Sequence, residues 1–386
     1  MCFENRLVSD ILEFRVRPVL GVPVLCVTEV ARMRKIWVLV LLLLLAAQVL
    51  TAEVGEITYL VGRVEMTRDG AIYDEYDMDI GMAVDNYDQF QTSSDGELVI
   101  SLDTPESPQS EIAIAPNTTF TIEIENIDGT QKTTLGLFTG SIGLKVKKLS
   151  GKQELEVNSE TVSMGVRGTD FTVHSSPAGD VLVSCESGRV ACYDEEEDRE
   201  YYAEPGKVVE KRAQELFRQI PVSVSNLRSF REQWIAERIS AFKANALKAI
   251  AFYAKWYVAY YDSFVEEYNA LMEQKDILNR WAREDAEGEI GSRIQNMKDL
   301  KEINPHILKL RGILVVFERV YFRLLELETY YLEGYGRGTI QSGLTATAFF
   351  RRFEAEREGL KTAMAKYRYV LKLRNKRSDS IFSFDF

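Results

Sequence analysis

The sequence predicts an α+β protein with strands and helices in separate domains: an N-terminal all-β domain and then a C-terminal long-helix bundle or coiled coil. Between Val54 and Val209, short runs alternate apolar and polar residues, with turn residues roughly every ten positions, as strands do. From Asn226 onward, apolar residues recur at every third and fourth position, as in amphipathic helices. The 386 residues suffice for two or three domains.

Charge divides the chain at the same place. Residues Glu53 to Pro205 include 31 acidic and 10 basic side chains, whereas Gly206 to Phe386 include 24 acidic and 31 basic ones. An acidic, strand-rich half argues against nucleic acid as a partner, because phosphate binding requires a basic face. Most of this charge should be solvated and screened. We therefore expect two independently folded units that a protease separates within a linker, residues 210–225.

An apolar segment near the N-terminus predicts export. A basic start at residues 33–35 precedes an apolar run at 36–47, which together have the form of a secretory signal peptide over residues 33–52. Cleavage before Glu53 would release a periplasmic or secreted protein. The alternative is an uncleaved membrane anchor, although the apolar run is shorter than the roughly 20 residues that a span needs. Residues 1–32 show no strand or helix period, so Met33 is the expected true start.

The predicted β domain, residues 53–209, contains a weak internal repeat of strand, glycine turn and strand. Its clearest strands are Ile57–Leu60, Glu97–Leu102, Phe120–Ile124 and Leu155–Val157. Four glycines stand just before an outgoing strand, where a positive φ costs glycine nothing; they are Gly62, Gly96, Gly140 and Gly188. The repeat fits either a short solenoid or a sandwich, and both alternatives stay open.

Three or four long helices are expected in the helical domain, residues 226–376. The first apolar stripe runs to about Glu287, as one helix or as two in series. Asn304 and Pro305 predict the start of another helix, since Asn is a good cap and Pro suits the first turn. A last helix is expected over residues 345–374.

Aromatic residues of the first stripe, Trp234 to Tyr268, are interpreted as the core of the bundle. The neighbours Tyr260 and Tyr261, like Tyr330 and Tyr331, lie about 100° apart around a helix, so one ring of each pair can face outward. Exposed aromatic rings favour a protein interface, and an oligomer through the helices is one such interface. Residues 377–386 are expected to form an edge-pairing or disordered tail.

A motif in the second half of the β domain carries a family resemblance. Val166, Arg167, Gly168 and Thr169, with Phe171, resemble the V-R-G-T-x-F core of the FecR domain, the extracytoplasmic module of ferric-citrate-type regulators. Matching elements extend the resemblance over residues 54–210; they include Gly62-Arg63-Val64, Phe90-Gln91-Thr92, Leu137–Ile142, Cys185–Val190 and Pro205–Val208.

The resemblance implies an all-β fold more than a signalling role. Anti-sigma regulators of the family carry a helical cytoplasmic domain before a membrane span, and residues 1–32 are too short for one. Within the motif, Gly168 lets the chain turn where a Cβ would clash, and Arg167 offers five donors that can tie loop carbonyls together. We interpret the motif as a structural turn, with ligand contact as the alternative.

No catalytic residue, cofactor or metal is expected. His174 and His306 are the only histidines, one just past a strand and the other in the opening turn of a helix, and both are interpreted as surface residues. The zinc-protease, nucleophile-elbow and P-loop motifs are all missing. The acidic runs 74–79 and 194–198 lack the spacing of a calcium loop, so we interpret them as solvated faces.

Cys185 and Cys192 flank a predicted hairpin turn. An exported protein can hold a disulfide there, provided that both side chains face one way with Cβ atoms within about 4.5 Å. A register slip of one residue prevents this. The sequence leaves open whether the two cysteines form a disulfide or are two small buried apolar side chains.

The sequence thus predicts an exported, non-enzymatic FecR-domain protein that acts by binding a protein or ligand in the bacterial cell envelope, in an interaction or scaffold role. Its expected partner is another envelope protein. It would contact the membrane only through an uncleaved signal segment. The alternative is an extracytoplasmic sensor in transmembrane signalling, related to anti-sigma regulators.

Overall fold

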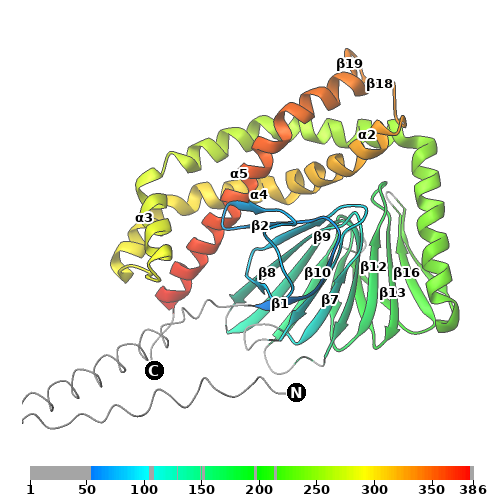
Figure 1. Ribbon diagram of the computed structural model, residues 1–386, viewed down its shortest axis with the longest axis horizontal. Helices are drawn as coiled ribbons and strands as arrows, with labels where there is room; N and C mark the ends of the chain where they lie inside the picture. The colour runs from blue at the N-terminus through cyan, green and yellow to red at the C-terminus, as the bar shows by residue number, and fades with distance from the viewer. Residues whose placement is uncertain are drawn as a thin grey trace, which may run out of the picture. The chain divides into compact units, whose positions relative to one another are not determined.

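The computed structural model describes residues 54–103, 108–127, 129–147, 149, 153–194, 198–212 and 215–382. Strands fill the first half of this part and long helices the second, which confirms the α+β prediction (Figure 1). The predicted start at Met33, the signal peptide at 33–52 and the end of the tail lie outside the described residues. None of the described helices combines the length and apolarity needed to cross a membrane.

The strands form two sheets. Sheet A consists of β1 (Gly55–Val61), β4 (Ala83–Val84), β6 (Glu97–Leu102), β7 (Ser110–Ile114), β12 (Asp170–Ser175), β13 (Val181–Ser187), β16 (Lys207–Lys211) and β17 (Phe217–Pro221). Sheet B consists of β2 (Val64–Arg68), β3 (Ala71–Tyr73), β5 (Gln89–Thr92), β8 (Thr119–Ile127), β10 (Gln153–Asn158), β11 (Ser163–Val166), β14 (Val190–Asp194) and β15 (Arg199–Ala203). The pairings are antiparallel except that of β10 with β9.

One long strand, β9 (Thr130–Val146), belongs to both sheets. Its first half pairs with β8 and β10 of sheet B, and its second half pairs with β7 and β12 of sheet A. Gly140 lies at the change of sheet with a φ of +82°, and a Cβ there would lie 2.3 Å from Thr118 Oγ1. The predicted turn at Gly140 is therefore a bend inside a continuous strand, which only glycine can make here.

The core between the two sheets decides between solenoid and sandwich. Every second residue of most strands points inward, as period two requires, and the inward residues of both sheets form one cluster. Ile57, Ile100 and Val173 come from sheet A, and Phe120 and Met164 come from sheet B. Because a solenoid would stack its repeats through parallel strands, and among the described strands only β10 and β9 pair in parallel, the β half is a sandwich whose chain crosses between the two sheets.

The segment predicted as a linker, residues 210–225, is largely structured. Its strand β17 pairs antiparallel with β16 along five residues, Phe217 to Pro221, and Phe217 is buried in the sandwich core. The turn residues around Pro205 suggested a boundary, but the chain adds one more strand before its helices begin. The strands and helices of the described residues therefore belong to one compact unit.

Four long helices follow, after a short 3-10 turn, η1 (Val224–Asn226). They are α2 (Leu227–Met272), α3 (Lys275–Ala286), α4 (Arg293–Leu332) and α5 (Ala346–Phe382). The first stripe thus contains two helices in series. The glycine-rich loop before α5 carries a small hairpin, β18 (Thr339–Gln341) and β19 (Leu344–Thr345). Helix α5 continues through residue 382, so most of the predicted tail is helical.

The predicted start of a helix at Asn304 and Pro305 is wrong. Helix α4 begins at Arg293, where the side chain of Ser292 caps it by accepting a bond from Gln295 N at 3.3 Å. Pro305 lies inside the helix. Buried residues on both sides of it, Ile303 and Ile307, keep the helix packed on the core, which offsets the lost backbone bond.

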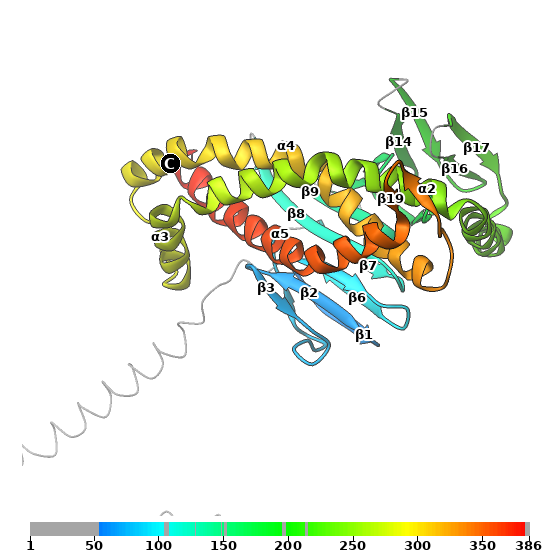
Figure 2. The ribbon, with the colours of Figure 1, turned by 90° about the horizontal axis from the view of Figure 1, so that it is seen from above.

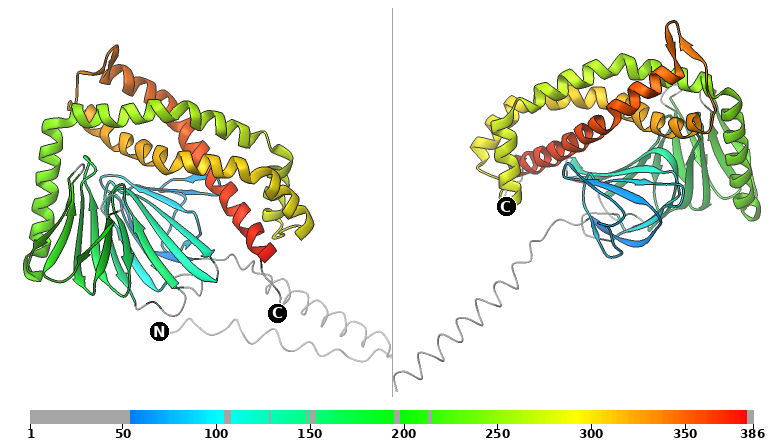
Figure 3. Two further views of the ribbon diagram at one scale, coloured as in Figure 1. Left: turned by 180° about the vertical axis from the view of Figure 1, so that it is seen from behind. Right: turned by 45° about the horizontal axis from the view of Figure 1, so that its top comes forward.

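Helix α2 bends at Asn245, whose φ of −125° and ψ of 18° are not helical. We call residues 227–244 its first limb and residues 246–272 its second limb. Figure 1 shows the first limb standing beside β12, β13 and β16, and the second limb running across with α4 and α5. Seen from above and from behind, these three helices lie over one side of the strands (Figures 2 and 3).

Charged side chains join the helices to the sandwich. Basic residues of the helices reach carboxylates of the strands and their turns: Arg231 pairs with Glu186, Arg311 with Glu123 and Glu125, Arg323 with Glu160, Lys361 with Glu65, and Lys372 with Asp69 and Asp85. Some of the opposite charges of the two halves therefore pair at the interface between helices and sandwich, although the sequence predicted that most of these side chains would be solvated.

Candidate functional site

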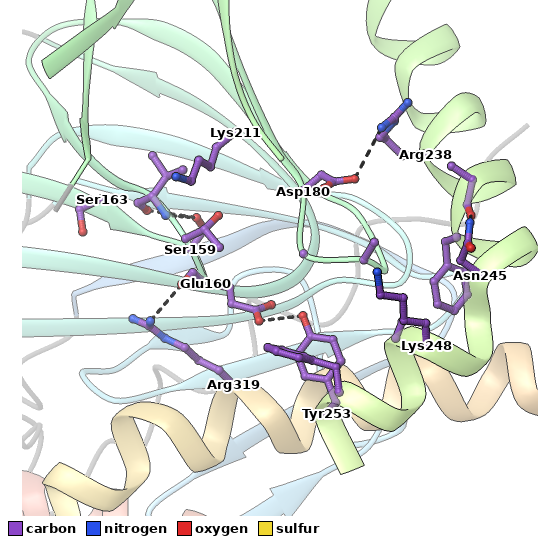
Figure 4. Close-up of a pocket in the computed structure, with 18 of the residues that line it drawn as sticks. Ser159, Glu160, Ser163, Asp180, Lys211, Arg238, Asn245, Lys248, Tyr253 and Arg319 are labelled. Carbon is purple, nitrogen blue, oxygen red and sulfur yellow. Dashed lines mark hydrogen bonds and ion pairs between the residues drawn. The ribbon is translucent and has the colours of Figure 1, made fainter. Parts of the chain in front are cut away.

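A cavity of about 620 Å³ opens where the bend of α2 meets the sandwich. On the sandwich side it is lined by the β10–β11 turn, residues 159–163, and by the β12–β13 turn, residues 178–180. On the helical side both limbs of α2 and Arg319 of α4 contribute. Figure 4 shows these residues facing one another across the space.

The floor of the cavity is a hydrogen-bonded group around Glu160. Tyr253 donates from Oη to Glu160 Oε1 at 2.7 Å, and Arg319 donates to the backbone oxygen of Glu160 at 3.2 Å (Figure 4). Arg323 donates to Glu160 Oε2 at 3.2 Å. A Cβ at Gly179, whose φ is +85°, would lie 2.9 Å from Tyr253 Oη. Burial, followed by the charge of Glu160, raises the pKa of Tyr253 well above its usual range, so this phenol stays a donor.

Four cationic side chains surround the cavity: Lys211, Arg238, Lys248 and Arg319. Arg238 lies 3.9 Å from the carboxylate of Asp180, and its Nε is buried without a hydrogen-bond partner among the described residues. Lys248 is exposed. Glu160 and Asp180, both from the acidic half of the chain, are the lining carboxylates, so the four cations from the basic half give the cavity an excess of positive charge.

His174 lies within β12, not past the strand end, and the first limb of α2 covers its sheet. It is half-buried, and its Nε2 has no hydrogen-bond partner in the described part of the chain. Burial, and then the charge of Arg231, lowers the pKa of His174 to about 4. The prediction of a surface histidine is therefore wrong, because α2 comes back over a sheet face that the sequence leaves open. His306, also predicted at a helix start, lies inside α4.

The motif of Val166, Arg167, Gly168, Thr169 and Phe171 forms the turn between β11 and β12. Val166 and Phe171 point into the sandwich core, and Gly168 takes a φ of +64°. Arg167 is exposed and makes no hydrogen bond to a described residue. Contrary to the expectation from the sequence, it therefore does not tie loop carbonyls together. The glycine shapes this turn, while the arginine stays available at the surface.

Replacing Gly168 tests this assignment. We expect Gly168→Val to lower the free energy of unfolding by about 1–3 kcal/mol, because a β-branched residue is strained at positive φ. Arg167→Ala is the matched control and should stay within about 0.5 kcal/mol of the parent, as surface substitutions do. Chemical denaturation of the three proteins measures both values. If Gly168→Val is as stable as the parent, the assigned role of Gly168 in the turn is contradicted.

Cys185 and Cys192 are separate thiols in the structure. Cys185 lies on β13 of sheet A and Cys192 on β14 of sheet B, and both point into the core. Burial raises the pKa of Cys185 to about 11 and that of Cys192 to about 12, so neither side chain is an activated thiolate. Of the two alternatives, the structure has the pair of small buried side chains.

The outward aromatic residues differ from those predicted. Tyr260, Tyr261 and Tyr330 are partly buried, and Tyr331 is buried. The exposed rings of α2 belong instead to Phe252 and Trp256, with exposed fractions of 44% and 39%. We call Phe252, Trp256 and Tyr260 the outer aromatic row; the ring centroids of Trp256 and Tyr260 are 5.8 Å apart.

Sequence analysis missed the cavity because its residues come from distant segments. Glu160 and Tyr253 are 93 positions apart, and Glu160 and Arg323 are 163 apart. No local period or motif marks them. The one sequence signal is Asn245, a poor helix former in the middle of an otherwise strong helical stripe, where the bend occurs. Among the described residues, no group of three His, Cys, Asp or Glu side chains is arranged to hold a metal.

Comparison with known proteins gives one family match. No curated protein matches the chain. Two crystal structures of a candidate anti-sigma factor from Parabacteroides distasonis ATCC 8503 match with 11% and 12% identity, each with a TM-score of 0.31. Each match covers 37% of this chain and 63% of that one, so the chain spans less than two thirds of those structures. Residues 88–191 match the family model described as FecR protein, and the strand-rich half of this chain therefore carries a FecR region.

Proposed function

We propose that this chain is a non-enzymatic binding protein of the bacterial cell envelope, with its helices as the partner surface. The outer aromatic row carries the proposal. The other large aromatic residues of α2 are buried or partly buried, whereas Phe252 and Trp256 are exposed. Tryptophan and tyrosine are enriched at the centres of protein interfaces. The FecR match supports a role in regulation rather than catalysis.

Trp256→Ala tests the partner surface. If Trp256 anchors a partner, its loss should cost about 2 kcal/mol of binding free energy, a rise in Kd of about 30-fold. The matched control is Tyr76→Ala, which removes a ring that is 89% exposed on the β half. We expect proteins captured from the native envelope by the parent and by Tyr76→Ala to be lost with Trp256→Ala. Equal capture by all three contradicts the proposal.

A sensor role is the second candidate, favoured by the cavity that the FecR half and both limbs of α2 share. A ligand bound there would contact the sandwich and the bend of the helix together. The fate of the apolar run at residues 36–47 distinguishes the two roles. We propose cleavage before Glu53, and the intact mass of the protein from an envelope fraction tests it. A mass that retains residues 36–45 contradicts release and favours an anchored sensor.

A further inference from the structure

We propose that the cavity at the bend of α2 binds a small organic anion, with one carboxylate or phosphate group beside Arg238 and an apolar body against the aromatic side chains of α2. Trp256 of the partner surface does not line the cavity, whereas Phe252 of the outer aromatic row does, so the two sites share this one ring. The argument rests on the charge of the lining residues, on unpartnered buried atoms, and on the volume and apolar wall.

The charge of the walls selects an anion. Of the two lining carboxylates, Glu160 already accepts bonds from Tyr253 and from Arg323, and Arg323 is fully buried behind the cavity wall. Asp180 lies 3.9 Å from Arg238, which is longer than a hydrogen bond. Lys248 is exposed, and Arg319 donates to a neutral backbone oxygen, so the charges of both side chains can attract an anion in the cavity. Figure 4 shows Lys211, Arg238, Lys248 and Arg319 on different sides of it.

Arg238 is the expected contact for the anionic group. Its side chain is 16% exposed, and its buried Nε lacks a partner among the described residues. A buried donor without a partner costs free energy, and an ion or water that accepts from it recovers that cost. The guanidinium fork matches the paired oxygens of a carboxylate or phosphate. The hydroxyl of Thr161, which lines the same cavity and is also buried without a partner in the described chain, can add a second polar contact.

The rest of the wall suits an apolar body. Phe242, Ala249, Phe252 and Tyr253 of α2 line the cavity together with Val162 of the β10–β11 turn. Binding sites for small molecules have volumes of about 300–1,000 Å³, mostly apolar walls and a few placed polar groups. At about 620 Å³, this cavity holds a molecule the size of a substituted aromatic acid. An inorganic ion would leave most of the space unfilled.

Binding of small probes to the full chain tests the proposal by calorimetry at low salt. Benzoate and phenyl phosphate each carry an aromatic ring and an anionic group, and comparing them distinguishes recognition of a carboxylate from recognition of a phosphate. Benzamide keeps the ring without the charge, and inorganic phosphate keeps the charge without the ring. We expect at least one of the two aromatic anions to bind at least ten-fold more tightly than both benzamide and inorganic phosphate. Equal binding of inorganic phosphate indicates an adventitious ion only, and equal binding of benzamide refutes anion selection.

Two variants locate the binding. Arg238→Gln should weaken binding of the preferred anion at least ten-fold, whereas Arg228→Gln, which changes an exposed arginine on the same limb, should leave it unchanged. Because Arg238→Gln could disturb the fold, Lys248→Gln serves as a second variant: Lys248 is exposed, and its loss should weaken binding several-fold without changing thermal unfolding. Failure of all aromatic anions to bind, or unchanged binding in both cavity variants, overturns the site. Retained partner capture in that case leaves the proposed function intact.

Discussion

Arg323→Met is expected to lower the free energy of unfolding by about 3–5 kcal/mol, the cost of breaking a buried ion pair from one side. Arg323 of α4 has no exposed surface. Its guanidinium donates to Ser176 O at 2.6 Å, to Ser175 Oγ at 2.8 Å and to Phe138 O at 3.2 Å, all in the sandwich. It also pairs with Glu160 and Glu326.

The charge of Arg323 is stabilised despite its burial. Burial opposes the charge, but Glu326 and Glu160 more than compensate and raise the pKa of Arg323 above its usual range. Methionine fills similar space and leaves these carboxylates and two backbone oxygens without their donor. Arg323→Lys keeps the charge but loses the planar fork, so we expect an intermediate loss.

Denaturant unfolding of the full chain measures this effect. Arg352→Met is the matched control, since Arg352 is half-exposed, pairs with Glu356 one turn away on α5 and lies 5.0 Å from the ring centroid of Tyr261, contacts worth about 1 kcal/mol or less each. The contacts of Arg323 also imply that helices and sandwich unfold together. A variant as stable as the parent, or two separate transitions of which Arg323→Met shifts neither, contradicts the role assigned here and favours two independent domains.

Local patterns predicted the elements of this fold well. Alternation identified the strands at residues 57–60 and 97–102 because each side of a sandwich strand meets a different environment. The aromatic stripe identified α2 because the buried face of a helix repeats apolar residues every three or four positions. The positive φ of Gly168 followed from its place in a turn motif.

Contacts between distant segments could not be predicted in this way. Gly140 has the local sequence of a turn, and only the pairing of β9 with four different strands makes it a bend between sheets. The excess of basic residues in the helical half could be counted from the sequence. Which of them are buried, such as Arg323 and Lys372, depends on how α4 and α5 pack against the sandwich. The cavity, which needs both limbs of α2, follows from the same approach.

Acid is expected to loosen the first limb of α2 from sheet A through His174. Arg231 of this limb bonds Ser184 Oγ at 3.2 Å and lies close enough to His174 to lower its pKa, after burial, to about 4. In an unfolded chain the pKa of histidine is about 6.5. Between these values the unfolded chain binds a proton that the folded chain does not. The stabilisation is complete above about pH 6.5, and it falls by about 3 kcal/mol as the pH drops to 4.

Several buried carboxyl groups, Asp88 and Glu123 among them, act in the opposite direction, so the effect of His174 must be measured as a difference. Burial raises the pKa of Asp88 to about 6, although Arg68 opposes the shift, and burial with the charge of Glu125 raises that of Glu123 to about 7. The folded chain holds these protons more tightly than the unfolded chain, so acid stabilises it at both sites. Unfolding free energies of the parent and of His174→Gln, compared from pH 7 to pH 4, cancel these contributions. We expect the parent to lose about 3 kcal/mol relative to the variant across this range, the same shift that the pKa change implies. If the unfolding free energies of the parent and of His174→Gln instead change in parallel with pH, His174 is protonated in the folded chain, and α2 does not cover it as the structure has it.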